Sequence, residues 1–126
     1  MKDINSLNAP KAVGPYSQAI EHAGVVYCSG QIGIDPQSGV LEEGVEKQAR
    51  RALTNLRAVL ESAGLTFSAI TMVTVYLQSM NDYSVMNDTY ASMFTSDPRP
   101  ARVTVAVAAL PKNALVEISC IATRNV

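Results

Sequence analysis

Three side chains near the C-terminal end of this 126-residue chain could act together on a small anionic molecule. Arg102 offers a planar guanidinium that can bind a carboxylate through two parallel hydrogen bonds, Thr104 a hydroxyl and Glu117 a carboxylate. Arg102 and Thr104 alternate with valines, so period-two geometry puts them on one face of a strand. A charge on a buried sheet face needs a partner or a ligand. We therefore hypothesise that the three groups converge on one sheet surface.

The alternative is that this sheet face is exposed to solvent and has no function. Antiparallel sheets often bury one face and expose the other, and a cross-strand pair of Arg102 and Glu117 on the exposed face would need no function. Charge clusters mark functional sites only statistically. The segment by itself leaves both interpretations open.

Length and composition predict one compact domain over residues 1–126, large enough to bury a core without disulfides. Hydrophobic residues make up 48% of the chain and charged residues only 17%, so we expect some apolar surface to be buried against other subunits. Ten Lys and Arg residues balance eleven Asp and Glu residues. This balance leaves no basic surface for phosphate backbones, so nucleic acid is a poor candidate partner.

Cysteine and histidine usage argues against a metal site. Cys28 and Cys120 lie far apart without the spacing of zinc ligands or of a redox pair, and both are interpreted as buried small hydrophobes. The single His22 cannot build a metal cluster. A polar N-terminus and no long apolar run predict neither a signal peptide nor a membrane span. The default expectation is a reduced compartment, the cytoplasm.

The elements that must position the candidate groups follow from hydrophobic spacing. Apolar residues at intervals of three and four predict a long helix over 41–63, ended by Gly64. A second helix is expected after Asn81 and Asp82. Its core stripe consists of Tyr83, Met86, Tyr90, Met93 and Phe94. Strands are expected at 16–20, 25–32, 70–77, 102–107 and 115–121, after an extended arm over 1–15.

The resulting order, β-β-α-β-α-β-β, predicts an α/β (α+β) fold: a hairpin, two crossover helices and a final antiparallel pair in one mixed sheet, with both helices on one face. The uncovered face is expected to pack against other copies around a symmetry axis. Gly30, following Ser29 inside a strand pattern, marks either a bulge or the close approach of a ligand. Spacing alone favours a solvent-facing Asn87.

Five motifs, in order along nearly the whole chain, closely resemble the RidA family, also called the YjgF family. They are Gly14-Pro15-Tyr16-Ser17-Gln18-Ala19, Ser29-Gly30-Gln31-Ile32, Asn87 with Tyr90 and Phe94, Pro100-Ala101-Arg102, and Leu110-Pro111-Lys112 with Val116-Glu117-Ile118. The resemblance implies a chorismate-mutase-like fold and a homotrimer with three clefts between neighbouring subunits.

The resemblance also implies an activity that needs no cofactor and no metal. It is the hydrolysis of 2-iminobutanoate and 2-iminopropanoate, tautomers of enamines released by pyridoxal-phosphate-dependent dehydratases, to 2-keto acids and ammonia. Arg102 would hold the substrate carboxylate, and Glu117 would hold or activate the attacking water. The cleft would be lined, partly from the adjacent subunit, by Tyr16, Ser29, Gly30 and Asn87.

One position departs from the family pattern. Many members have a cysteine near the imine or the water where this chain has Thr104. A hydroxyl can still orient water but cannot supply a thiol, so we expect hydrolysis without any thiol-dependent modification there.

Three other functions compete with the deaminase. A small-carboxylate binder or regulatory protein would keep Arg102 but would not need Glu117. A ribonuclease or translation inhibitor, roles also attached to this family, is disfavoured by the balanced charge. Chorismate mutase itself would need several cationic groups to hold a dicarboxylate, and Arg102 is the only convincing candidate on the sheet face.

Overall fold

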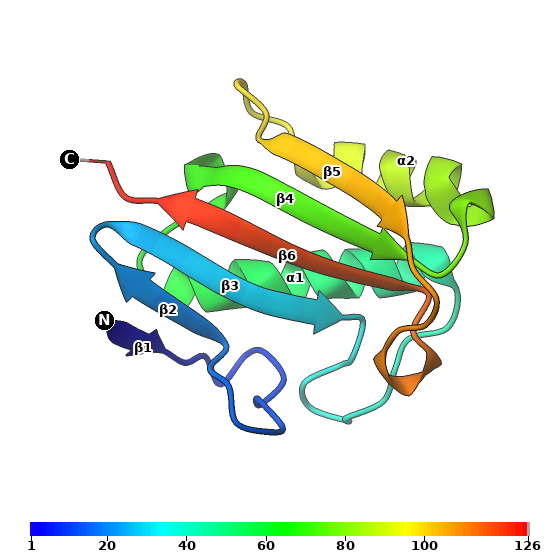
Figure 1. Ribbon diagram of the computed structural model, residues 1–126, viewed down its shortest axis with the longest axis horizontal. Helices are drawn as coiled ribbons and strands as arrows, with labels where there is room; N and C mark the ends of the chain where they lie inside the picture. Colours follow the sequence, from blue (N-terminus) through cyan, green and yellow to red (C-terminus); the bar gives the residue numbers. More distant parts are fainter. Residues whose placement is uncertain (126) are drawn as a thin grey trace.

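The computed structural model describes residues 1–125, in which six strands form one mixed sheet and two α-helices cover one of its faces (Figure 1). This arrangement confirms the predicted architecture. The elements are β1 (Lys2–Ile4), β2 (Ala19–His22), β3 (Val25–Ile32), α1 (Val45–Ser62), β4 (Ile70–Leu77), α2 (Tyr83–Met93), β5 (Ala101–Ala106) and β6 (Val116–Thr123).

The strand order is β1-β2-β3-β6-β4-β5, and only β4 and β5 pair in parallel. The predicted final antiparallel pair is therefore wrong, because β4 lies between β5 and β6. Helix α2 is a crossover that returns the chain parallel to β4 on its outer side. Strand β6 instead runs antiparallel to both β3 and β4 in the middle of the sheet.

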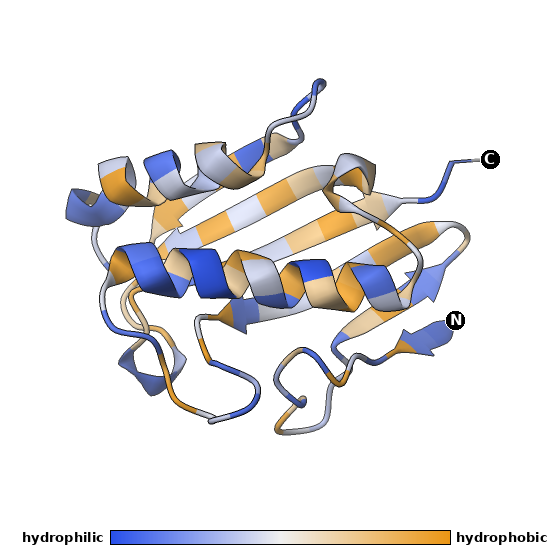
Figure 2. Cartoon of the chain, turned by 180° about the vertical axis from the view of Figure 1, so that it is seen from behind, coloured by the Kyte–Doolittle hydropathy of each residue, from blue (hydrophilic) through white to orange (hydrophobic). Residues whose placement is uncertain are grey.

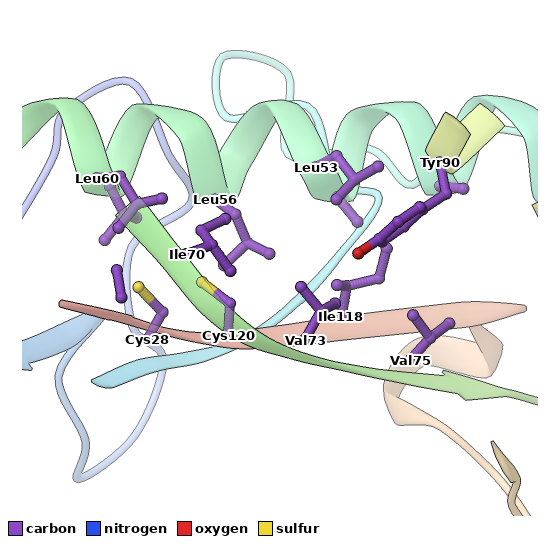
Figure 3. Packing of buried hydrophobic residues seen from close by; sticks show 14 of the residues in the cluster. Cys28, Leu53, Leu56, Leu60, Ile70, Val73, Val75, Tyr90, Ile118 and Cys120 are labelled. Carbon is purple, nitrogen blue, oxygen red and sulfur yellow. The ribbon is translucent and has the colours of Figure 1, made fainter. Parts of the chain in front are cut away.

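The core lies between the helices and one face of the sheet, here called the helix face. Leu53, Leu56 and Leu60 of α1 point toward this face in Figure 3, and all three are buried. Alternate residues of β4 and β6 meet them, including Val73 and Ile118. The 3.6-residue period of the helix and the two-residue period of the strands thus bury one stripe and one face.

Helix α1 begins later than the sequence predicts, but it ends at the predicted place. Leu41 forms a bridge with Ile34, and Gly44 has a φ of 82°, so the chain becomes helical only at Val45. At the other end Gly64 has a φ of 74°, and Leu65 N–H donates to the Leu60 carbonyl. This is a Schellman ending, in which glycine supplies the left-handed residue.

The N-terminal arm is more ordered than the sequence predicts. It contains β1, and the strand predicted from residue 16 begins only at Ala19. Buried Gln18 holds the arm: its Oε1 accepts from Ser6 N–H at 2.6 Å, and its Nε2 donates to the carbonyls of Ser6 at 3.1 Å and Pro10 at 2.8 Å. One side chain thus fixes the segment that leads to Tyr16.

The other face of the sheet, here called the open face, carries no helix. Seen from behind in Figure 2, α1 and α2 cover only the near side of the sheet. Large side chains on the open face remain accessible, with exposed fractions of 49% for Tyr27, 43% for Val103 and 39% for Val105. No helix in the described part of the chain is long and apolar enough to cross a membrane.

Candidate functional site

Arg102 lies on β5 with its side chain on the helix face. It is the register partner of buried Val73, and α2 packs over it. Its Nη2 donates to the hydroxyl of Tyr83 at 2.9 Å, and its Cζ lies 4.7 Å from the ring centroid of Tyr90 and 5.8 Å from that of Tyr83. A hydrogen bond and cation–π contacts therefore fix the guanidinium.

Thr104 follows on the same face, beside Val75. Its Oγ1 is buried and has no hydrogen-bond partner within residues 1–125, and the same holds for the hydroxyl of Tyr90. Burial raises the pKa of Tyr90, so this phenol stays neutral. In Figure 3 its hydroxyl points from α2 toward the sheet.

Asn87 lies on α2 four residues after Tyr83 and three before Tyr90, so the three share one stripe of the helix. Asn87 is partly buried and partly accessible to solvent. The contacts of Arg102 with Tyr83 and Tyr90 join this stripe to the face of β5 that carries Arg102 and Thr104. We call Arg102, Thr104, Asn87 and the two tyrosines the cation cluster.

Glu117 lies on β6 with its side chain on the open face, beside Tyr76 of β4. A Cβ atom on Gly30 would lie 2.6 Å from Glu117 Oε2, so glycine is what lets the carboxylate rest against β3. Within residues 1–125 the carboxylate has no ion pair and no hydrogen bond, and burial raises its pKa. It is an unpartnered proton acceptor.

The glycine in β3 reflects both a bulge and a close approach. The register passes from Cys28 paired with Cys120 to Gln31 paired with Ile118, so Ser29 and Gly30 form the bulge. The group that approaches Gly30 is a side chain of the same chain.

Ser29 and Tyr16 lie next to this bulge. Ser29 Oγ donates to the Ser17 carbonyl at 2.6 Å, and Tyr16 and Ser29 both line a cavity of about 330 Å³. Tyr16 remains 54% exposed. We call Tyr16, Ser29, Gly30 and Glu117 the carboxylate cluster.

The two clusters lie on opposite faces of the sheet. Arg102 is on the helix face of β5, whereas Glu117 is on the open face of β6, with β4 between the two strands. Two strand spacings alone separate them by about 9–10 Å. The prediction that Arg102 and Glu117 converge on one surface is therefore wrong for a single chain.

Two residues of the cation cluster were missed by the sequence reasoning. Tyr83 and Tyr90 were assigned to the apolar stripe of the second helix, and Tyr90 is indeed buried. The stripe explains the rings but not the hydroxyls. Buried tyrosine hydroxyls usually need a partner, and this was the available signal.

The cysteines behave as predicted. Cys28 and Cys120 are register partners on neighbouring strands, and both are free and buried among apolar residues (Figure 3). Residues 1–125 contain no group of three or more His, Cys, Asp or Glu side chains that could hold a metal ion.

Comparisons with known proteins match almost the whole chain. The family described as Endoribonuclease L-PSP matches residues 6–124. A RutC family protein of Pyrococcus horikoshii is 47% identical over 119 residues, covering 94% of each chain. A 2-iminobutanoate/2-iminopropanoate deaminase of Salmonella typhimurium is 43% identical over 126 residues, covering 98% of each chain.

Solved structures show the same fold. A Rid family protein of Yersinia pestis superposes with a TM-score of 0.95 at 50% identity, covering 97% of this chain and 98% of that one. TdcF of E. coli, crystallised with bound serine, superposes with a TM-score of 0.95 at 38% identity, covering 99% and 100%.

Proposed function

This chain belongs to the Endoribonuclease L-PSP family, also called the RidA family, and from that premise we propose that it is an imine deaminase. Its substrates would be 2-iminobutanoate and 2-iminopropanoate, which it would hydrolyse to 2-keto acids and ammonia without a cofactor. Relatives named for this activity match 98% of the chain. We place the reaction in the cytoplasm, carried out by residues 1–126 as one domain.

The proposed active site forms between two copies of the chain in a homotrimer. One subunit supplies its cation cluster, and its neighbour supplies the carboxylate cluster. Strand β5 is an edge strand, so its outer side is free to meet another chain, and the open face exposes Tyr27, Val103 and Val105. Such an assembly would bring together groups that a single chain keeps on opposite faces.

Arg102 would bind the substrate carboxylate. A guanidinium has five N–H donors, and Tyr83 occupies one of them, so a pair remains for a bidentate contact. This contact would orient C2 of the protonated imine, which is already electrophilic, toward the neighbouring subunit.

Glu117 would act as the base. As the oxygen of a water molecule bonds to C2, the carboxylate takes a proton from that water and later returns it to the amine of the carbinolamine. The C–N bond then breaks and ammonia leaves, while the hydroxyl loses its remaining proton to Glu117 and its oxygen becomes the carbonyl oxygen. Glu117 passes this proton to the departing ammonia, which leaves as ammonium, and the carboxylate is restored. General base catalysis of this kind contributes roughly a hundredfold or more, and a raised pKa brings Glu117 closer to the operating pH.

The remaining residues would shape the cleft. Thr104 would orient the water through its hydroxyl, and Asn87, Tyr16 and Ser29 would line the walls. Gly30 would let Glu117 lie close to the backbone of β3.

One observation carries the proposal: Glu117 is a partly buried carboxylate, seated against Gly30, without a partner in residues 1–125. A structural carboxylate would be paired, whereas a base must keep its lone pairs free.

The test generates 2-aminoacrylate in situ from serine with a dehydratase and follows pyruvate release. We expect pyruvate to be released faster with the protein than in buffer. A competing amine that traps the imine should correspondingly capture less of the imine when the protein is present. No acceleration over buffer would refute the deaminase.

A second candidate is a non-catalytic binder of small carboxylates, favoured by the bound serine in TdcF. The variant Glu117→Gln separates the two. Retained affinity for 2-ketobutyrate with lost turnover supports the enzyme, whereas a wild-type protein that binds the keto acid but hydrolyses no imine supports the binder.

A further inference from the structure

The guanidinium of Arg102 is held by α2 on two sides. Tyr83 accepts a hydrogen bond from Nη2 at 2.9 Å, and the ring of Tyr90 lies 4.7 Å from Cζ. No carboxylate pairs with Arg102 within residues 1–125, so neutral groups alone restrain this charge.

The support beneath Arg102 is itself fixed by stacking. The Tyr90 ring stacks on Phe94 with centroids 4.2 Å apart, and Phe94 stacks on Phe67 at 4.6 Å. Both Tyr90 and Phe94 are buried. Stacked, buried rings resist displacement, so Tyr90 gives the guanidinium a rigid surface on one face.

Tyr83 adds a directional hydrogen bond, which the cation–π contact with Tyr90 does not provide. A cation–π contact fixes the distance of the guanidinium from the ring but leaves it free to turn in its own plane. A hydrogen bond to one named nitrogen sets that angle. An arginine without such contacts loses side-chain entropy when a ligand immobilises it.

We infer that the Tyr83 hydroxyl is a positioning group, which sets the in-plane orientation of Arg102 so that its free N–H pair is directed at a ligand carboxylate. The inference rests on the proposed role of Arg102 in carboxylate binding and deepens it. Tyr83 acts through Arg102 and makes no covalent or proton-transfer step of its own. Its loss should weaken binding of the acid group without affecting the rest of the ligand.

The binding test compares Tyr83→Phe, which deletes only the hydroxyl, with Ser84→Ala, which deletes an exposed hydroxyl from the same turn of α2. Calorimetry measures the Kd for 2-ketobutyrate and for its neutral amide. We expect Tyr83→Phe to weaken 2-ketobutyrate binding about three- to tenfold, the scale of one hydrogen bond to a charged group. Amide binding and both Kd values of Ser84→Ala should stay at the wild-type level.

A double-mutant cycle separates positioning from general damage to α2. In an Arg102→Ala background, Tyr83→Phe should cause no further loss of affinity, because the group it positions is absent. Equal weakening of acid and amide, or full additivity with Arg102→Ala, would overturn the inference. So would wild-type affinity in Tyr83→Phe.

A third readout needs no ligand and no activity. In ¹⁵N NMR spectra of the free protein, the Nη signals of Arg102 should be resolved in the wild type, because Tyr83 hinders guanidinium rotation, and should broaden or merge in Tyr83→Phe. Identical spectra would overturn the inference. If Tyr83→Phe shows the spectral change but the wild-type protein hydrolyses no imine, the proposed function is refuted. Tyr83 then remains the group that orients Arg102.

Discussion

Arg102 and Glu117 are held in opposite ways, which suit the two roles proposed for them. Contacts with two tyrosines restrain Arg102, whereas the Glu117 carboxylate has no hydrogen bond or ion pair within residues 1–125. A binding group gains from a fixed geometry, because its entropy is lost before the ligand arrives. A base gains from unpaired oxygens and a low-dielectric setting, which together raise its proton affinity.

Replacing Arg102 by lysine tests whether the planar fork matters or only the charge. Lysine keeps the charge but cannot make two parallel hydrogen bonds to a carboxylate or lie flat on Tyr90. We expect kcat/KM of Arg102→Lys to fall about tenfold or more in the coupled imine assay. Turnover at the wild-type level would rule out bidentate binding.

Replacing Gly30 by alanine tests whether the position of the Glu117 carboxylate against β3 matters for activity. The added Cβ would lie 2.6 Å from Oε2 and 2.9 Å from Cδ of Glu117, so the flexible end of that side chain must move. We expect kcat to fall about tenfold or more, because the base is displaced, while Tm changes by only a few degrees. Gly24→Ala has open space for the added Cβ but a φ of 79° that strains alanine, so it should lower Tm and leave kcat unchanged. An unchanged kcat in Gly30→Ala would show that Gly30 does not position the base.

The pKa of Glu117 gives a stability prediction with a definite sign. Burial raises the pKa above its ordinary value of 4.5, so the native state keeps the proton to higher pH than the unfolded chain. Between these two pKa values the free energy of unfolding falls as the pH rises. We therefore expect Glu117→Gln to have a higher Tm than the wild type at about pH 8, and a similar Tm at about pH 3.5, where Glu117 is protonated in both states. A lower Tm of Glu117→Gln at the higher pH would contradict this.

At the scale of elements, local patterns predicted the helices and strands well. Strand β4 spans Ile70–Leu77, the predicted range, because alternating β-branched residues specify a half-buried strand without help from distant residues. Gly64 ended α1 as predicted for the same local reason. Strand β1 was missed, since three residues, two of them charged, carry little periodic signal and depend on pairing with β2.

Strand order could not be predicted, because it depends on contacts far apart in sequence. The segment between β5 and β6 resembles a hairpin connection, yet β6 passes β5 and pairs with β3 and β4. The faces of Arg102, Thr104 and Glu117 along their own strands were predicted correctly from period two. Their separation was not, because it follows from the register along β4, which pairs Arg102 with Val73 on one face and Glu117 with Tyr76 on the other.

Gln18 supplies a prediction about the N-terminal arm. The variant Gln18→Leu keeps side-chain volume but removes hydrogen bonds to Ser6 and Pro10. Because this leaves buried backbone groups unpaired, we expect a loss of about 1–3 kcal/mol in the free energy of unfolding. Hydrogen exchange at Ser6 N–H should also become faster. Gln37→Leu, at an exposed glutamine, is the matched control, and unaltered exchange at Ser6 in Gln18→Leu would contradict this role.

At the scale of the whole molecule, the fold places the two clusters on opposite faces of a single chain. The cation cluster lies under α2 at the β5 edge, and the carboxylate cluster lies on the open face over β3 and β6. Exposed valines on β5 and an exposed Tyr27 lie on that same open face. Covering this apolar surface with a second copy would stabilise the assembly and could complete each site from two chains.

A mixing experiment tests whether each site is shared between subunits. Arg102→Ala and Glu117→Ala each lack one half, so each alone should be inactive in the imine assay. In a mixed homotrimer, a site whose cation comes from the Glu117→Ala chain and whose carboxylate comes from the Arg102→Ala chain is intact. Random co-assembly at equal amounts should restore about one quarter of the wild-type activity, because each neighbour has the required identity half of the time.

The control is the double variant Arg102→Ala with Glu117→Ala, refolded together with wild-type protein. In that mixture an intact shared site needs two wild-type neighbours, so activity should fall to about one quarter, below the half expected if every site lay within one chain. Light scattering would establish that all samples are trimers. Mixed single variants that remain inactive, although co-assembled, would show that Arg102 and Glu117 do not serve one reaction across a subunit boundary.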